Sequence, residues 1–170
     1  MIKTKNFMLR KPRTTDVNSL WKNYNDKEVM KSMVYMENEK EFKKDFKEMV
    51  KSEKKIKGIY KTLVIEVDKN AVGTISAGQR DEKNKKKLTI SYWIGKDYRN
   101  KGLMSKVIKE FTKYLFKKYN LNRIEAYVRK HNKKSLRVLE KNKFKTEGLL
   151  RKNNLIRNKP VDDYILSIVK

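Results

Sequence analysis

The basic stretch 99–102 reads Arg-Asn-Lys-Gly and lies where a β-branched run gives way to a helical pattern. A helix begins with unpaired backbone N–H groups and the positive end of its dipole, so phosphates bind there. Gly102 lets the backbone approach a phosphate without a Cβ atom in the way, and Arg99 and Lys101 add positive charge. The stretch predicts a diphosphate-binding turn, with a plain loop in a lysine-rich chain as the alternative.

Composition excludes several other chemistries. The 170 residues include no Cys and one His, His131, so disulfides and thiolate metal sites are excluded, and a His-based metal site or a Ser-His triad has almost no basis. We therefore expect no metal. Gly102 stands alone, without the Gly-Lys-Ser/Thr of a P-loop or the further glycines of a Rossmann motif.

The periodicity of apolar residues predicts the elements that position this turn. Helical spacing is found at 14–25, 40–52, 101–118 and 132–142. Thr14 or Thr15 is the expected cap of the first helix. β-branched and alternating runs predict strands at 6–13, 60–67, 71–80, 87–95, 122–128, 144–151 and 162–170. Since several strands are consecutive, the order predicts an α/β chain (α+β mixed sheet) forming one domain over 1–170.

The formal net charge of +25 suggests a nucleic-acid partner. The lysines are spread over the whole chain together with many Asn and Ile, which is also typical of an AT-rich genome. No apolar run approaches the ~20 residues that span a membrane, and the basic start lacks the apolar stretch of a signal peptide. We expect a soluble cytoplasmic protein without a membrane partner.

The stretch 92–116 resembles the coenzyme A-binding segment of the GNAT N-acetyltransferase superfamily. The family motif R/Q-x-x-G-x-G/A reads here Arg99-Asn100-Lys101-Gly102-Leu103-Met104, with Met104 in place of a small residue. The block 121–151, which supplies Asn132 and Ser135, is similar to the branch that acetylates ribosomal proteins at an N-terminal alanine or serine. Lys143 replaces a usual Gly there. With similar opening and closing segments, the resemblance covers nearly the whole chain.

This resemblance implies a GNAT acyl-CoA N-acyltransferase fold, a central mixed sheet of about seven strands flanked by helices. Two parallel strands, here 89–95 and 123–128, would splay apart and hold the pantetheine arm of acetyl-CoA. Backbone groups at Trp93 and Ile94 would pair with the arm, and Asn132 would hydrogen-bond it. The diphosphate would lie on the N–H groups of 100–104. Further contacts to the ribose phosphate are implied for Lys133, Lys134 and Arg137.

The implied reaction is direct transfer of acetyl from the thioester to an amine. Ser135 matches the family position of the acid that protonates the leaving thiolate, and capping a helix is its alternative role. Tyr92 is a second candidate for proton transfer. Tyr127 and Tyr164 are candidates for contacting the amine substrate, although tyrosines in strands more often serve packing.

The general base is not identified by the sequence. Relatives often carry a Glu at the position of Thr89, and a threonine hydroxyl is no base at neutral pH. Glu125 on the neighbouring strand and His131 in a lysine-rich loop are alternatives, as is a water path from bulk solvent.

A protein N-terminal α-amine, of the ribosomal type, is the expected acceptor. A polyamine or aminoglycoside is opposed by the net charge unless an acidic pocket forms, for which the candidates are Glu37, Glu39, Glu41, Asp45 and Glu48. A small amino acid is a third acceptor. A non-catalytic coenzyme A-binding protein and a basic RNA-associated protein are the non-enzyme alternatives. We expect a monomer or homodimer, with weak RNA or ribosome association.

Overall fold

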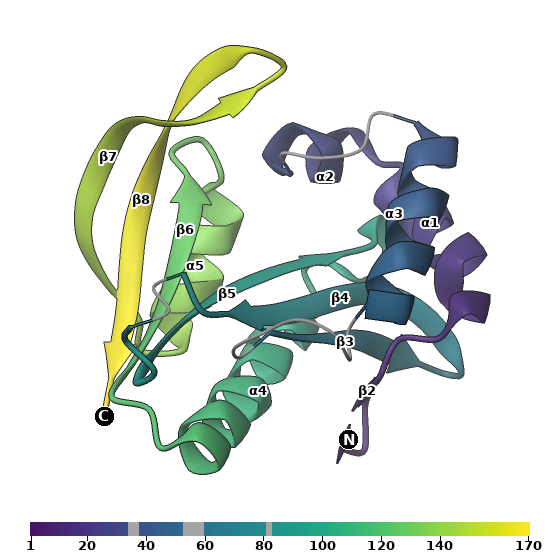
Figure 1. Cartoon of the computed structure of the whole chain (residues 1–170), viewed down its shortest axis with the longest axis horizontal. Coiled ribbons are helices and arrows are strands. Elements are labelled where there is room, and N and C mark those ends of the chain that lie inside the picture. The colour runs from purple at the N-terminus through teal and green to yellow at the C-terminus, as the bar shows by residue number, and fades with distance from the viewer. Residues whose placement is uncertain (34–37, 53–59, 81–82) are drawn as a thin grey trace.

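The computed structural model describes residues 1–33, 38–52, 60–80 and 83–170. Within these ranges, eight strands form one sheet in the order β1-β2-β3-β4-β5-β6-β8-β7 (Figure 1). All neighbouring strands are antiparallel except β5 and β6, which are parallel. The strands are β1 (Ile2–Lys3), β2 (Met8–Arg10), β3 (Tyr60–Val67), β4 (Asn70–Gly78), β5 (Lys87–Ile94), β6 (Arg123–Arg129), β7 (Lys145–Ile156) and β8 (Lys159–Val169).

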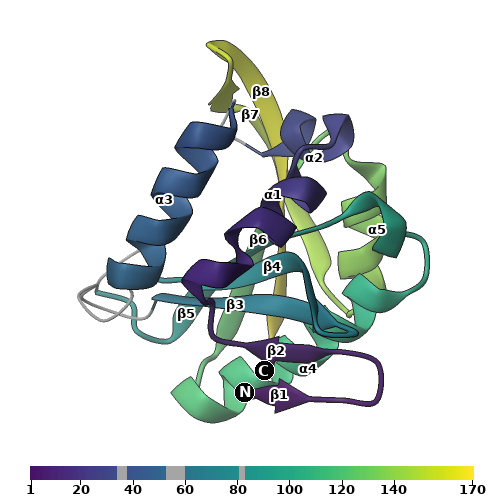
Figure 2. The same cartoon turned by 90° about the vertical axis from the view of Figure 1, so that its right-hand side faces the viewer.

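Helices cover both faces of this sheet (Figure 2). The helices are α1 (Val17–Tyr24), α2 (Lys27–Ser32), α3 (Glu39–Ser52), α4 (Leu103–Tyr119) and α5 (Lys133–Lys141), with 3-10 turns η1 (Thr14–Asp16) and η2 (Lys96–Tyr98). Side chains alternate between the faces of a strand. On β3, Val64 packs with α1 and α3 in one apolar cluster, whereas Leu63 and Ile65 pack with α4 and α5 in the other. The expected mixed sheet flanked by helices is therefore confirmed.

Helix α4 lies at the carboxyl end of β5 and carries a continuous apolar stripe. Val107, Ile108, Phe111 and Leu115 are fully buried along this stripe, as helical spacing of apolar residues predicts. The helix begins at Leu103, two residues later than predicted, because Gly102 adopts the left-handed conformation and cannot belong to the helix.

The parallel strands β5 and β6 pair over only half of their length. Lys87–Ile90 pairs with Arg123–Ala126, and no pairing between the two strands is found beyond Ile90 in the described chain. The two strands diverge there (Figure 1), so the second half of β5 leaves its β6-facing edge without a partner strand. The expected splay between two parallel strands is thus present.

Three local features differ from the sequence-based expectations. Strand β1 was not predicted, because its two residues are too few to give a pattern. Helix α2 was not predicted and is six residues long, with the Asp26 carboxylate accepting from the N–H groups of Glu28 and Val29. Capping by Thr14 or Thr15 was wrong, because both threonines lie within η1 and the N-cap of α1 is Asp16.

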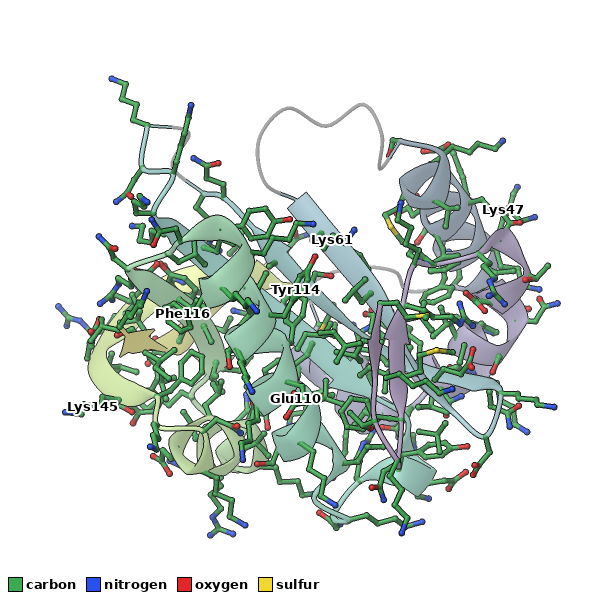
Figure 3. All side chains as sticks on the ribbon, turned by 90° about the horizontal axis from the view of Figure 1, so that it is seen from below. Lys47, Lys61, Glu110, Tyr114, Phe116 and Lys145 are labelled. Carbon is green, nitrogen blue, oxygen red and sulfur yellow. The ribbon has the colours of Figure 1, made fainter. Side chains whose placement is uncertain are left out.

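Basic side chains project from several edges of the molecule (Figure 3). They come from α3 and from β7 alike, as Lys47 and Lys145 illustrate. The excess positive charge is therefore spread over the fold. No helix in the described parts of the chain is both long and apolar enough to span a membrane.

Candidate active site

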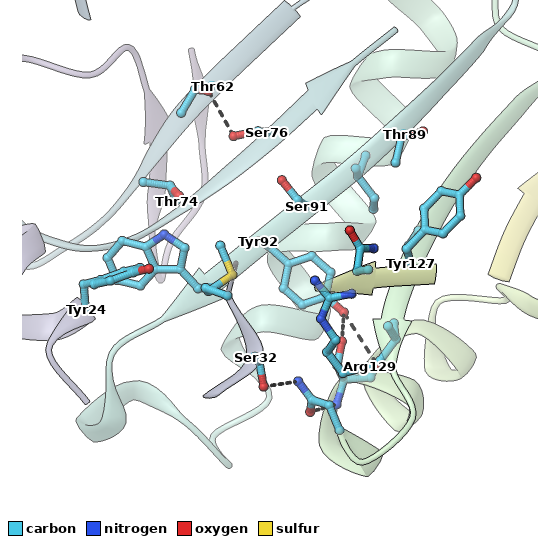
Figure 4. A pocket seen from close by; sticks show the side chains of 18 of the residues that line it. Tyr24, Ser32, Thr62, Thr74, Ser76, Thr89, Ser91, Tyr92, Tyr127 and Arg129 are labelled. Carbon is cyan, nitrogen blue, oxygen red and sulfur yellow. Dashed lines mark hydrogen bonds between the residues drawn. The ribbon is translucent and has the colours of Figure 1, made fainter. Parts of the chain in front are cut away.

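A cavity of about 440 Å³ lies where β5 and β6 separate. Aromatic side chains from α1, α3 and β5 form its apolar wall, and the opposite wall comes from β6 and α5 (Figure 4). Tyr24 packs edge-on against Trp93, with 5.3 Å between ring centroids, and Phe42 lies 4.9 Å from Tyr24. This aromatic cluster fixes the distance between the first helices and the sheet, which keeps the cavity open.

The floor of the cavity is a row of hydroxyl groups on one face of the sheet. Thr62 on β3, Ser76 on β4 and Ser91 on β5 lie opposite one another in register, and all three line the cavity. The hydroxyls of Thr62 and Ser76 are 2.9 Å apart. Thr89 lines the same floor (Figure 4). The row can order water at the sheet surface, because each hydroxyl both donates and accepts.

Two of the predicted catalytic residues meet beside this floor. The hydroxyl oxygens of Tyr92 and Ser135 are 2.7 Å apart, and Ser135 donates its backbone N–H to the Asn132 side chain at 3.1 Å. Asn132 is the N-cap of α5, so the start of this helix holds Ser135 against Tyr92. Burial raises the pKa of Tyr92, against the opposing effect of the hydrogen bond with Ser135.

The predicted diphosphate turn has the backbone geometry that an anion site needs. Gly102 has a φ of +70° and is the N-cap of α4, and no side chain among the described residues caps this helix. A Cβ atom built on Gly102 would have no atom within 4 Å. Asn100 is also left-handed, with a φ of +61°. Asn100 and Lys101 are exposed, whereas the Met104 side chain is buried in the core. The N–H groups of the first turn are therefore open to a ligand.

The Arg99 side chain in this turn is held by α2 and by the end of β5. Its guanidinium pairs with Asp26 at 2.5 Å and Glu28 at 3.0 Å, and its Nε donates to the Ile94 carbonyl at 3.2 Å. Burial acts to raise the pKa of Asp26, but hydrogen bonds from Arg99 and from the Val29 N–H hold it below its usual range. Arg99 therefore ties helix α2 to the turn.

Helix α2 is held at two further points on the predicted cofactor side. Lys134 pairs with Glu28 at 3.1 Å, and the Asn132 amide donates to the Ser32 hydroxyl at 3.2 Å. Ser32 and Asn132 both line the cavity. The unpredicted helix thus connects the N-terminal half of the chain to the turn and to α5.

Four further predicted site residues, all on strands, are divided by strand geometry. Trp93 and Ile94 lie on the part of β5 that has no β6 partner. Tyr127 lines the cavity, with the Arg80 guanidinium 4.1 Å above its ring. Tyr164 is not among the described lining residues; it packs on the α4–α5 core. Since Val128 is its β6 partner, Tyr164 lies on the opposite face from Tyr127, which does not support contact with the amine.

Neither of the charged candidates for proton removal, Glu125 and His131, is among the described residues that line the cavity. Glu125 is 5% exposed and accepts from the Arg123 Nε at 2.8 Å. His131 is exposed, and burial, with the charges of Lys31 and Arg129, lowers its pKa. Among the described lining residues the carboxylate comes from Asp45 on α3.

The expected acidic cluster only partly faces the cavity. Glu39 pairs with Lys43 on the helix surface at 2.7 Å, and Glu41 and Glu48 are exposed without lining the cavity. Glu37 lies outside the described residues. Glu39 is therefore paired along a solvated helix and does not contribute to an acidic pocket.

Sequence reasoning missed a polar network in the cavity wall. Arg129 at the end of β6 pairs with Asp163 on β8, and Asn153 and Asn154 on β7 donate to the same carboxylate. Arg129 and Asn154 line the cavity. A run of two asparagines beside an exposed hairpin reads as a turn in the sequence, and only the pairing of β6, β7 and β8 brings these residues together.

Comparisons with known proteins agree with this geometry. The family described as "Acetyltransferase (GNAT) domain" matches residues 6–145. The chain is 30% identical over 109 residues to an uncharacterized N-acetyltransferase, p20 of Bacillus licheniformis, over 64% of this chain and 61% of that protein. The match thus spans about three fifths of that relative's length.

Solved structures share the fold. A crystal structure of RimL, a ribosomal L7/L12 α-N-protein acetyltransferase, superposes with a TM-score of 0.86 at 18% identity, covering 98% of this chain and 92% of that one. The microcin C7 self-immunity acetyltransferase MccE, in complex with acetyl-CoA and AMP, gives a TM-score of 0.85 at 22% identity, covering 98% and 94%.

Proposed function

Because the chain belongs to the GNAT acetyltransferase family, we propose that it transfers acetyl from acetyl-CoA directly to an amine. The favoured acceptor is the N-terminal α-amine of a protein of the ribosomal type. We propose that residues 1–170 act as one acetyltransferase domain in the cytoplasm, as a monomer or homodimer. The basic surface would contribute weak attraction to ribosomal RNA.

The observation that carries the proposal is the open edge of β5 next to the uncapped start of α4. An extended chain can add to an unpaired strand edge through main-chain hydrogen bonds, which suits the amide-containing pantetheine arm at Trp93 and Ile94. A diphosphate suits the left-handed Gly102 and the first-turn N–H groups, with Lys101 as its mobile charge. Asn132 lies at the opposite border of the gap.

Acetyl-CoA would supply the activated acetyl group as a thioester. In the transfer a C–N bond forms, the C–S bond breaks, and the thiolate takes up one proton. Tyr92 and Ser135 share a hydrogen bond at the gap, and the raised pKa of Tyr92 keeps its phenol protonated near neutral pH. We assign proton donation to this hydroxyl pair, with Ser135 orienting the phenol.

The amine must lose a proton before or during attack. The hydroxyl row of Ser91, Ser76 and Thr62 runs from the β5–β6 gap across the sheet floor. We propose that water ordered on this row accepts the proton and passes it to bulk solvent. This arrangement would take the place of the glutamate carboxylate that relatives often carry at the position of Thr89. It needs no charged base inside the cavity.

A protein N-terminus is favoured over a polyamine by the lining charges. Arg80 and Arg129 both line the cavity, whereas Asp45 is the acidic residue among the described lining residues. A polycation would meet two guanidinium groups there. Similarity to RimL, which is named for acetylating a ribosomal protein, supports the same acceptor class.

The test is release of coenzyme A thiol from acetyl-CoA in the presence of candidate amines. Peptides beginning with alanine or serine should be acetylated at the α-amine, as verified by the mass of the product. Spermidine and an aminoglycoside serve as the competing acceptors. Faster turnover of spermidine than of every peptide would overturn the acceptor class, and no turnover of any amine despite acetyl-CoA binding would favour the non-catalytic alternative.

A further inference from the structure

Arg129 presents an unused hydrogen-bonding edge to the cavity. The residue is 9% exposed, and its Nε is the only buried side-chain nitrogen or oxygen without a partner in the described part of the chain. Figure 4 shows its side chain directed into the cavity, on the same side as Tyr127. A buried donor left without a partner is unfavourable. A ligand oxygen that accepts a hydrogen bond from Nε would remove this cost.

Asp163 holds the opposite side of this guanidinium. Both carboxylate oxygens accept from Nη1, at 2.5 and 2.6 Å, and Asp163 is fully buried. The amides of Asn153 and Asn154 donate to the same carboxylate at 2.8 and 2.7 Å. The carboxylate thus has three partners among the described residues, and it holds the Nη1 side of the guanidinium from β8.

The free edge consists of Nε and Nη2. No acceptor for either nitrogen is found among the residues that the structure describes. These two N–H groups form a parallel fork that matches a carboxylate or carbonyl oxygen. Because Asp163 already balances the charge of Arg129, the fork can serve a neutral carbonyl as well as an anion.

We propose that Arg129 determines acceptor specificity by binding the carbonyl or carboxylate oxygen on the carbon next to the reacting amine. This rests on the acetyl transfer proposed above and defines its substrate more closely. An α-amino acyl group, whether a peptide N-terminus or a free amino acid, carries such an oxygen. Polyamines and aminoglycoside amines carry none at that position. Asp163 is the positioning residue that aims the fork.

The experiment compares alaninamide with isopropylamine, which has the same branched amine but no carbonyl. Arg129→Lys keeps a charge beside Asp163 and removes the fork. It should raise the KM of alaninamide by about 10- to 100-fold, the loss expected for a charge-assisted hydrogen bond. The KM of isopropylamine should change less than ~3-fold, and the kcat of both acceptors should change little. Equal effects on both acceptors would overturn the proposal.

Arg80→Lys is the matched control, because Arg80 also lines the cavity but stacks on Tyr127. It should affect both acceptors alike. Selective loss of alaninamide in this variant would move the assignment to Arg80. The wild-type chain gives an independent reading if Arg129→Lys fails to fold. When KM is calculated from the concentration of unprotonated amine, its value for alaninamide should be at least ~10-fold below that for isopropylamine. Equal values would contradict the proposal.

A third acceptor separates the two sources of the oxygen. Free alanine used at least as well as alaninamide would identify a carboxylate, and preference for alaninamide would identify a peptide carbonyl. Acetylation of alaninamide with no effect of Arg129→Lys would refute the role of Arg129 and leave the proposed function intact. Turnover of spermidine but not of alaninamide would refute the role of Arg129 and the proposed acceptor class, and acetyl transfer to an amine would stand.

Discussion

At the scale of single residues, the hydroxyl pair of Tyr92 and Ser135 carries the proposed proton donation. Tyr92→Phe removes the donor and should lower kcat by roughly 10²-fold. Ser135→Ala should lower kcat less, because the phenol remains and only its orientation is lost. The Kd of acetyl-CoA, measured by calorimetry, should change less than ~3-fold in both variants. Full kcat in both would transfer the acid role to water.

The pH dependence of kcat tests the same residue. Burial raises the pKa of Tyr92 above the ordinary tyrosine value of 10.0, since a phenolate is disfavoured away from water. A raised pKa keeps the donor protonated until the pH exceeds that value. Hence kcat should rise as the amine loses its proton and then hold a plateau up to pH 10. A fall below that pH that is absent in Tyr92→Phe would contradict the raised pKa, because it would show that Tyr92 loses its proton below pH 10.

Individual residues were predictable where their role depends on neighbours in the chain. Gly102 was identified from its place before a helix, and its left-handed φ agrees. Arg99 was expected to face a phosphate because of its charge, but its partners Asp26 and Glu28 are more than seventy positions away in the chain. Likewise, the orientation of the Arg129 side chain depends on Asp163. Only the antiparallel pairing of β6 with β8 brings these two residues together.

At the scale of elements, the turn between β5 and α4 can be tested by charge alone. Gly102→Asp and Gly102→Asn both meet open space and share the same left-handed strain, which Asn and Asp tolerate best among residues with a side chain. Only Asp places a negative charge at the start of α4. Calorimetry should show acetyl-CoA binding at least ~10-fold weaker in Gly102→Asp than in Gly102→Asn. Equal affinities would show that the diphosphate binds elsewhere.

The two cations of this turn should have different roles, Arg99 in stability and Lys101 in cofactor binding. Arg99→Leu removes the guanidinium that pairs with Asp26 and Glu28, although Glu28 keeps Lys134, and the Arg99 side chain is only 16% exposed. It should lower the free energy of unfolding by about 1–3 kcal/mol in a urea titration. Lys101→Gln, at an exposed position, should change stability by less than ~0.5 kcal/mol but weaken acetyl-CoA binding at low salt. The reverse pattern would restore Arg99 as the phosphate contact.

The long elements were predictable, and the short ones were not. Helix α4 and the β3–β4 hairpin follow from periods of 3.6 and 2 sustained over many residues. Helix α2 has one buried apolar residue, Val29, so its sequence carries no stripe. Its position depends instead on Arg99, Lys134 and Asn132, contacts that exist only once the chain has folded. Since α2 borders the cavity, this omission also hid part of the site.

At the scale of the whole molecule, the net charge of +25 could by itself attract an anionic cofactor without a specific site. Polyanions bind a basic surface through many weak contacts that salt screens. Ligands held by backbone N–H groups and a strand edge are screened less, because they are partly removed from solvent. Salt dependence therefore separates a built cofactor site from general attraction to the basic surface.

The most direct measurement is the thermal shift that acetyl-CoA produces at low and at high salt. With the cofactor at about 100 times its Kd, mass action should stabilise the fold by roughly 2.7 kcal/mol. For a chain of this length, that raises Tm by roughly 5 to 10 °C. We predict that a substantial part of the shift persists at high salt, and that Gly102→Asp lowers the shift by about half or more, as a ~10-fold weaker affinity requires. A shift that disappears with salt and is unaffected by Gly102→Asp would contradict the account.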